Sequence, residues 1–143
     1  MKISTKYHGD VEMEEKDLIF FQNGLPGFIG EKEFVLLPLE SDSPLLILQS
    51  VKSKDLGFIM INPFNYFHSY EFELSKPDKD FLEIHSESDI TILTIITVKE
   101  PFEDSTVNLM APIIINVKNK KAKQVILNNS IYNSRTKLFN GLK

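Results

Sequence analysis

The chain has 143 residues, of which 42% are hydrophobic and 25% are charged, and it contains no cysteine. This composition is that of an ordinary globular protein, and the length predicts one domain spanning residues 1–143. The lack of cysteine excludes disulfides, thiolate metal sites and cysteine nucleophiles. No apolar stretch is long enough to cross a bilayer and no secretory signal is recognisable, so we expect a cytoplasmic protein that does not bind membranes.

The net charge of −4 is distributed unevenly along the chain. Residues 1–104 hold all 20 acidic residues and 9 of the 16 basic ones, a net −11. Residues 105–143 hold the other 7 basic residues and no acidic one. Such a field attracts a basic protein and repels nucleic acid. A solvated acidic face beside a solvated basic hairpin explains the same pattern.

Short apolar runs bounded by turn residues predict strands along most of the chain. Residues 90–98 are β-branched almost throughout and apolar on both faces, which is typical of a central strand. The last two expected strands are joined as a hairpin. The expected strands are residues 2–7, 17–21, 45–48, 58–61, 70–74, 90–98, 111–117 and 121–127.

A tight turn is expected after the second of these strands. Gly24 and Gly27 adopt positive φ angles easily, and Pro26 fixes its own φ. Pro26 followed by Gly27 suits a type II turn with glycine at its third position. Such a turn would hold Leu25 and Phe28 in defined positions, either partly exposed as apolar partner contacts or as anchors to the core.

The segment 70–74 alternates apolar and acidic residues. Tyr70, Phe72 and Leu74 would lie on one face of a strand, with Glu71 and Glu73 on a wet face. Side chains expected in the core include Phe72, Leu93 and Ile95.

One helix is predicted from about Pro77 to His85. Ser75 is placed to cap its first turn, and Pro77 and Asp78 suit the positive end of a helix. A second short turn is expected within 103–109. We therefore predict a mainly β protein: a small, highly curved antiparallel sheet or barrel with one or two short helices.

Sequence patterns of enzymes are missing. The three histidines, His8, His68 and His85, do not have metal-ligand spacing, and His85 with Glu87 makes only a pair. No nucleophile elbow and no phosphate-binding glycine loop occurs. We expect no catalytic, metal or cofactor site, and a small β-barrel hydrolase is disfavoured on these grounds.

Single-strand RNA binding is the alternative function. Residues 118–123 form a basic hairpin tip, and small strand-rich domains include RNA-binding barrels. However, no aromatic residue lies between Phe102 and Tyr132 to stack on bases, and the chain is acidic overall. We therefore expect no direct nucleic-acid binding.

Six segments together resemble the flagellar assembly factor FliW family, over nearly the whole chain. A Phe-x-x-Gly-Leu-Pro-Gly-Phe turn matches residues 21–28, and an apolar-Ala-Pro-apolar strand matches residues 109–116. The other matching segments are Phe34-Val35-Leu36, Leu48-Gln49-Ser50, Phe58 to Pro63, and the basic hairpin Lys120 to Gln124.

This resemblance implies a partner-switching regulator. Members of the family bind flagellin before its export and, alternately, the RNA-binding translational repressor CsrA, which relieves repression of flagellin translation. An acidic binder suits a basic RNA-binding protein, since it repels phosphate from the complex. Direct occlusion of the RNA site is the rival mechanism. The candidate contacts are Leu25 and Phe28 for flagellin, and Glu71, Glu73, Asp78, Asp80 and Glu83 for the repressor.

Overall fold

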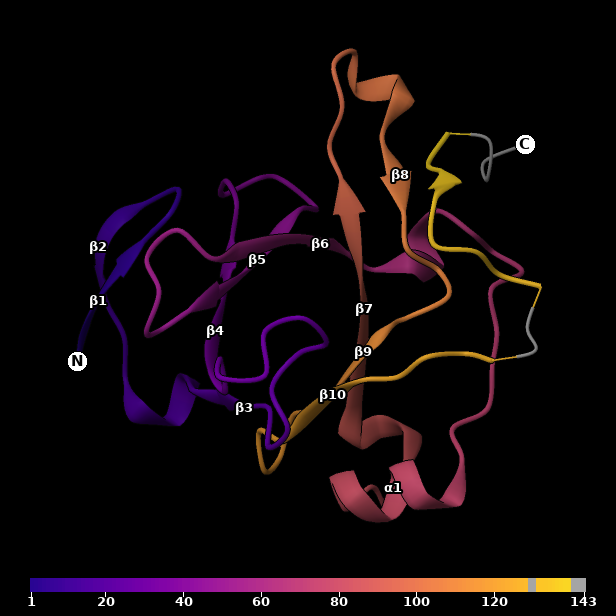
Figure 1. Cartoon of the computed structure of the whole chain (residues 1–143), viewed down its shortest axis with the longest axis horizontal. Coiled ribbons are helices and arrows are strands. Elements are labelled where there is room, and N and C mark those ends of the chain that lie inside the picture. The colour runs from indigo at the N-terminus through magenta and orange to yellow at the C-terminus, as the bar shows by residue number, and fades with distance from the viewer. Residues whose placement is uncertain (129–130, 140–143) are drawn as a thin grey trace.

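A computed structural model describes residues 1–128 and 131–139 of the chain (Figure 1). Strands dominate these residues, and one short α-helix, α1 (Lys76–Leu82), interrupts them. The strands are β1 (Lys2–Thr5), β2 (Gly9–Glu12), β3 (Ile19–Phe20), β4 (Glu33–Pro38), β5 (Leu46–Ser50), β6 (Gly57–Ile61), β7 (Ile90–Thr97), β8 (Thr106–Val107), β9 (Ile113–Asn116), β10 (Ala122–Gln124) and β11 (Thr136–Lys137). Single 3-10 turns lie at Glu15–Asp17, Pro63–Asn65, Glu87–Asp89 and Phe102–Asp104.

The main sheet is antiparallel and curls until its two ends meet. Its strand order is β10-β9-β7-β6-β5-β4-β3, with β8 pairing to β7 and to β11. The Phe20 N–H of β3 donates to the Lys120 carbonyl beside β10 at 2.8 Å, and Phe20 forms a bridge with Lys121. This contact joins β3 and β10, the strands at the two ends of the sheet order. The predicted class, a highly curved antiparallel sheet or barrel, is therefore confirmed.

The closed sheet encloses a core of large apolar side chains. Phe34 of β4 is fully buried, and its ring meets that of Phe21 edge-on at a centroid distance of 5.2 Å. Leu48, Met60 and Leu93 fill the same core from β5, β6 and β7. Strand β7 lies centrally, pairing with β6, β8 and β9, as its doubly apolar sequence predicts.

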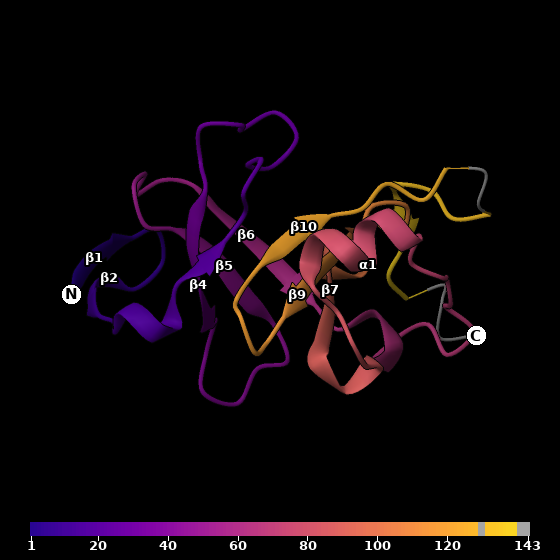
Figure 2. The same ribbon diagram turned by 90° about the horizontal axis from the view of Figure 1, so that it is seen from below.

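Helix α1 covers the outer side of the β9–β10 hairpin (Figure 2). Its buried Leu82 packs against Ile114 of β9 and Val125, which follows β10. Ser75 caps the helix as predicted, because its Oγ accepts the Asp78 N–H at 3.2 Å. The helix ends at Leu82, earlier than the predicted His85, because Glu83 adopts a left-handed conformation with φ of 56°.

Three further predictions about local structure are wrong. Residues 70–74 form no strand, since no neighbouring strand pairs with them. Phe72 and Ile95 are half-buried, whereas Leu93 is fully buried as expected. Residues 9–12, for which no strand was predicted, form β2 and pair with β1 as a separate hairpin.

The turn between β3 and β4 has the predicted backbone geometry. Gly24 and Gly27 have φ angles of +69° and +85°, and the Phe28 N–H donates to the Leu25 carbonyl at 2.7 Å. A Cβ on Gly24 would lie 2.5 Å from the Ile29 carbonyl oxygen, whereas a Cβ on Gly27 would meet nothing within 4 Å. Gly24 is therefore required for a close approach of backbone as well as for its φ.

Alanine substitutions should separate these two constraints. Gly27→Ala is expected to destabilise the fold by about 1–2 kcal/mol, because a β-carbon disfavours positive φ. Gly24→Ala should destabilise it more, since it adds a clash with the Ile29 backbone. Gly30 has no such φ and no neighbour within 4 Å, so Gly30→Ala is the control. Urea unfolding measures all three, and equal stabilities for Gly24→Ala and Gly30→Ala would contradict the assignment.

Candidate functional site

Three of the five candidate acidic residues form ion pairs within the chain. The Asp78 carboxylate lies 2.5 Å from Lys123 Nζ, and this aspartate side chain is only 13% exposed. Asp80 pairs with Lys76 of its own helix at 3.2 Å. Glu83 pairs with Lys121, whose hydrogen bond lowers the pKa of the Glu83 carboxyl. The acidic helix and the basic hairpin therefore neutralise each other in part.

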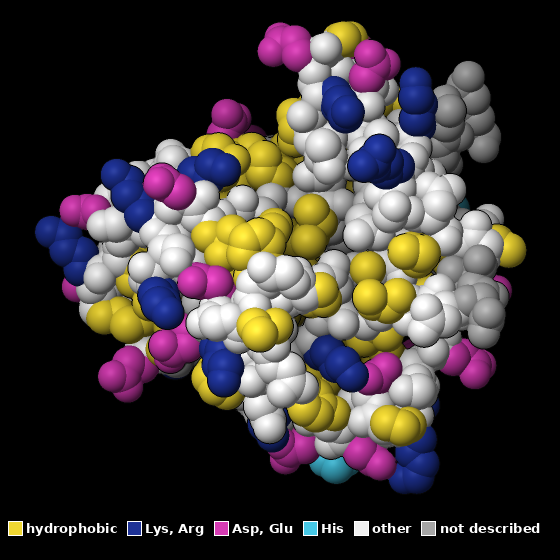
Figure 3. Space-filling view, in the orientation of Figure 1, with side chains coloured by type: hydrophobic (Ala, Val, Ile, Leu, Met, Phe, Trp, Pro, Cys, Tyr) yellow, Lys and Arg dark blue, Asp and Glu magenta, His cyan; other side chains and the backbone are white. Residues whose placement is uncertain are grey.

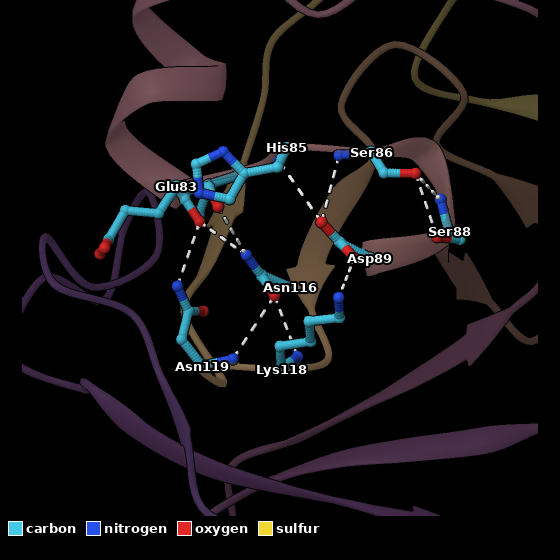
Figure 4. A network of polar contacts seen from close by, with 9 residues as sticks. Glu83, His85, Ser86, Ser88, Asp89, Asn116, Lys118 and Asn119 are labelled. Carbon is cyan, nitrogen blue, oxygen red and sulfur yellow. Dashed lines mark hydrogen bonds and ion pairs between the residues drawn. The ribbon is translucent and has the colours of Figure 1, made fainter.

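A buried amide holds the helix and the hairpin in this relation (Figure 4). Asn116 at the end of β9 donates from Nδ2 to the carbonyls of Leu82 at 2.8 Å and Glu83 at 3.2 Å. Its Oδ1 accepts the backbone N–H groups of Lys118 and Asn119. One side chain thus satisfies orphan carbonyls at the helix end and orders the hairpin turn.

Asp89 adds a second link to the same hairpin (Figure 4). This carboxylate is buried, accepts the backbone N–H groups of His85 and Ser86, and pairs with Lys118 at 2.9 Å. The ammonium group of Lys118 is the main cause that lowers the pKa of the Asp89 carboxyl. Three lysines of the basic hairpin, at 118, 121 and 123, are therefore already engaged, which weakens the case for RNA binding.

The other two candidate acids differ from these three. Glu71 and Glu73 are exposed and have no ion-pair partner among the described residues. Both line a groove of about 630 Å³ between the segment 71–75 and the chain that follows β10. Its apolar lining comes from Phe72, Val125, Ile126, Leu127, Ile131 and Tyr132.

Aromatic contacts hold one wall of this groove in place. The Tyr132 ring lies 4.6 Å from the ring of Tyr70, and its hydroxyl accepts the Glu71 N–H at 2.9 Å. Tyr70 is buried, donates its hydroxyl to the Leu109 carbonyl at 2.8 Å, and has a pKa raised by that burial. In Figure 3, apolar side chains gather in this region, over the chain that continues from β10.

The glycine-rich turn presents a second, separate surface. Leu25 is 1% exposed and belongs to the barrel core, so the prediction that it could contact a partner is replaced by its role as an anchor. Phe28 is 42% exposed, although its ring meets the ring of Phe58 edge-on at a centroid distance of 5.6 Å. Ile29, which was not predicted as a contact, is 74% exposed. The only feature of the sequence that could have pointed to Ile29 as a contact is its position directly after Phe28.

Neither surface has the residues of a metal site. Within residues 1–128 and 131–139, no three His, Asp or Glu side chains gather closely enough to hold a metal ion. No helix in that part of the chain is long and apolar enough to cross a membrane.

The chain is similar to known proteins over almost its whole length. The model of the family described as FliW protein matches residues 2–138. The chain belongs to the FliW family. Flagellar assembly factor FliW of Geobacillus kaustophilus (strain HTA426) is 52% identical over 139 residues, which cover 97% of this chain and 96% of that protein. Flagellar assembly factor FliW of Bacillus subtilis (strain 168) is 50% identical over 135 residues, 94% of each.

A solved structure agrees with the sequence relatives. The crystal structure of the flagellar assembly factor FliW superposes with a TM-score of 0.94 at 50% identity and covers 97% of both chains. The family resemblance inferred from the turn and strand motifs is confirmed.

Truncation should distinguish the two apolar residues of the turn. Leu25→Ala is expected to destabilise the fold by about 2–5 kcal/mol, as for other buried leucines. Phe28→Ala should destabilise it clearly less, because much of its ring already contacts water. Urea unfolding at neutral pH measures both. An unchanged free energy of unfolding for Leu25→Ala would show that it does not anchor the turn.

The buried Asp89 carboxylate predicts a pH dependence. Its folded-state pKa lies below the ordinary value of 3.8, so the ionised form stabilises the fold above that pH. This contribution is lost as the pH falls through the folded-state pKa. Asp89→Asn should therefore be less stable than the parent at pH 7, and the difference should shrink in acid.

The matched control is Asp80→Asn, which alters an exposed ion pair and should change stability by about 0–1 kcal/mol. Denaturant unfolding at pH 7 and near pH 3 gives both differences. A constant deficit for Asp89→Asn at both pH values would argue against the ionic contribution.

Proposed function

We propose that this protein is a cytoplasmic flagellar assembly factor. It binds flagellin and, alternately, the translational repressor CsrA, so that repression of flagellin translation is relieved. The observation that carries the assembly role is similarity along almost the full length, about 50% identity, to relatives named flagellar assembly factor FliW. The proposal includes no enzymatic step and no cofactor.

Two separate surfaces support a regulator with two partners. The turn that carries Phe28 and Ile29 lies apart from helix α1 (Figures 1 and 2). The turn is apolar and stiff, which suits contact with an apolar face of unassembled flagellin. The groove is rimmed by free carboxylates, which suits the basic repressor.

The structure changes which acidic residues should matter most for the repressor. Asp78, Asp80 and Glu83 already have lysine partners, so a second cation would gain less from them. Glu71 and Glu73 are exposed and lack such partners among the described residues. We therefore assign the leading electrostatic contact to these two glutamates. With the repressor bound at these glutamates, the protein would keep RNA away either by repelling its phosphates or by covering the RNA site of the repressor.

Charge reversal at these positions tests the assignment. Glu71→Lys with Glu73→Lys should weaken the repressor complex about tenfold or more, roughly 1.4 kcal/mol. The weakening should shrink with added salt, because exposed charges are screened. Titration calorimetry with the repressor and with flagellin from the same organism measures both affinities. Flagellin binding should persist.

The control is Glu40→Lys with Asp42→Lys, which makes the same change in charge at exposed positions between β4 and β5. If both doubly substituted proteins bind the repressor equally well at low salt, the groove does not contact it. If the parent protein binds neither flagellin nor the repressor, the proposed function is wrong. Tight, steeply salt-dependent binding of single-stranded RNA would favour the alternative instead.

A further inference from the structure

The segment 70–74 has the side-chain pattern of a strand but no strand beside it. Tyr70 is buried, Phe72 and Leu74 are half-buried, and Glu71 and Glu73 between them are exposed. This period of two is that of a β-strand with one face on a core. The segment runs towards α1 along the edge of the molecule, outside the sheet (Figure 1).

Its backbone groups are correspondingly free. Within the described residues, neither the N–H nor the C=O groups of Phe72, Glu73 and Leu74 form a hydrogen bond. The N–H groups of Tyr70 and Glu71 are bonded, to the Phe67 carbonyl and to the Tyr132 hydroxyl. A row of free donors and acceptors on an extended chain is a template for pairing with another strand.

The facing side of the groove is also a sheet edge. The chain after β10 continues the antiparallel pairing, with Val125 N–H bonded to the Pro112 carbonyl at 2.9 Å and Leu127 N–H to the Met110 carbonyl at 2.7 Å. Alternate residues of such a strand direct their backbone groups to its other side. There the Ile126 N–H has no partner within the described chain, and its side chain is 49% exposed.

We propose that this groove binds an extended protein segment in which apolar and basic residues alternate, added as a strand along residues 71–74. Backbone pairing would supply much of the affinity, and pockets for alternate side chains would supply the selectivity. Apolar side chains of the segment lie against Phe72, Leu127 and Tyr132. Its basic side chains reach Glu71 and Glu73.

The charge of the occupant follows from the groove itself. The ammonium group of Lys123 on β10 is already paired with Asp78, which lines the groove. The two glutamates on the rim have no cation beside them among the described residues, so a basic segment would supply their ion-pair partners. An acidic segment would instead be repelled. The inference does not depend on which protein carries the segment, and it is therefore separate from the assignment of flagellin and the repressor.

A blocked octapeptide of alternating leucine and lysine is the probe, with a leucine–glutamate octapeptide as its partner control. Backbone NMR spectra of the intact protein should shift for residues along 71–74 and 125–127 on adding the first peptide. Amide hydrogen exchange at Phe72, Glu73 or Leu74 should slow by at least tenfold. The acidic peptide should cause neither effect. No shift at millimolar peptide, or shifts without any protection of these amides, overturns strand addition.

Two substitutions at one position test the backbone contact. Glu73→Ala removes the carboxylate but keeps the N–H, whereas Glu73→Pro removes both. The proline variant should bind the basic peptide at least several-fold more weakly than the alanine variant. Circular dichroism and thermal unfolding confirm that both variants remain folded, and the peptide-dependent protection of the parent amides tests the proposal independently of them. Equal peptide affinity for folded proline and alanine variants contradicts the proposal, even if the flagellar function holds.

Discussion

The hydrogen bonds of Asn116 fix the geometry on which both charged elements depend. Its amide joins the carbonyl end of α1 to the hairpin that follows β9, and few other polar side chains of the described chain are so fully buried. An unsatisfied buried amide would be costly, so the helix and the hairpin are held in one register. In that register Asp78 meets Lys123 and Glu83 meets Lys121. The charge asymmetry of the sequence is thereby cancelled in part where the helix and the hairpin meet.

This cancellation changes how the surface should be interpreted. A run of acidic residues in a sequence predicts a negative face only if the fold leaves them unpaired, and here the fold pairs Asp78, Glu83 and Asp89 with the basic hairpin. What remains is a narrower feature: two glutamates beside apolar side chains and free backbone groups. The apolar turn with Phe28 and Ile29 is another exposed element, and it lies apart from α1 (Figure 2).

Features that depend on a few neighbouring residues were predicted correctly from the sequence. The positive φ of Gly24 and Gly27, the Ser75 cap and the central β7 were all predicted from short patterns. The alternation at 70–74 correctly predicted which side chains face inwards, but pairing depends on a neighbour elsewhere in the chain, and no described strand pairs with this segment. Burial of Leu25 and the ion pairs to Lys121 and Lys123 depend on contacts across many residues. No local pattern reports such contacts, so those parts of the candidate site required the structure.

The unpaired segment also has a consequence for the behaviour of the protein at high concentration. Two copies that met edge to edge along residues 71–74 could pair as strands, which is the first step of many aggregation processes. The same encounter would bring Glu71 and Glu73 of one copy towards those of the other, and like charges opposite each other destabilise a strand pair. The glutamates thus act as gatekeepers: they keep identical edges apart while leaving this edge open to a chain of opposite charge.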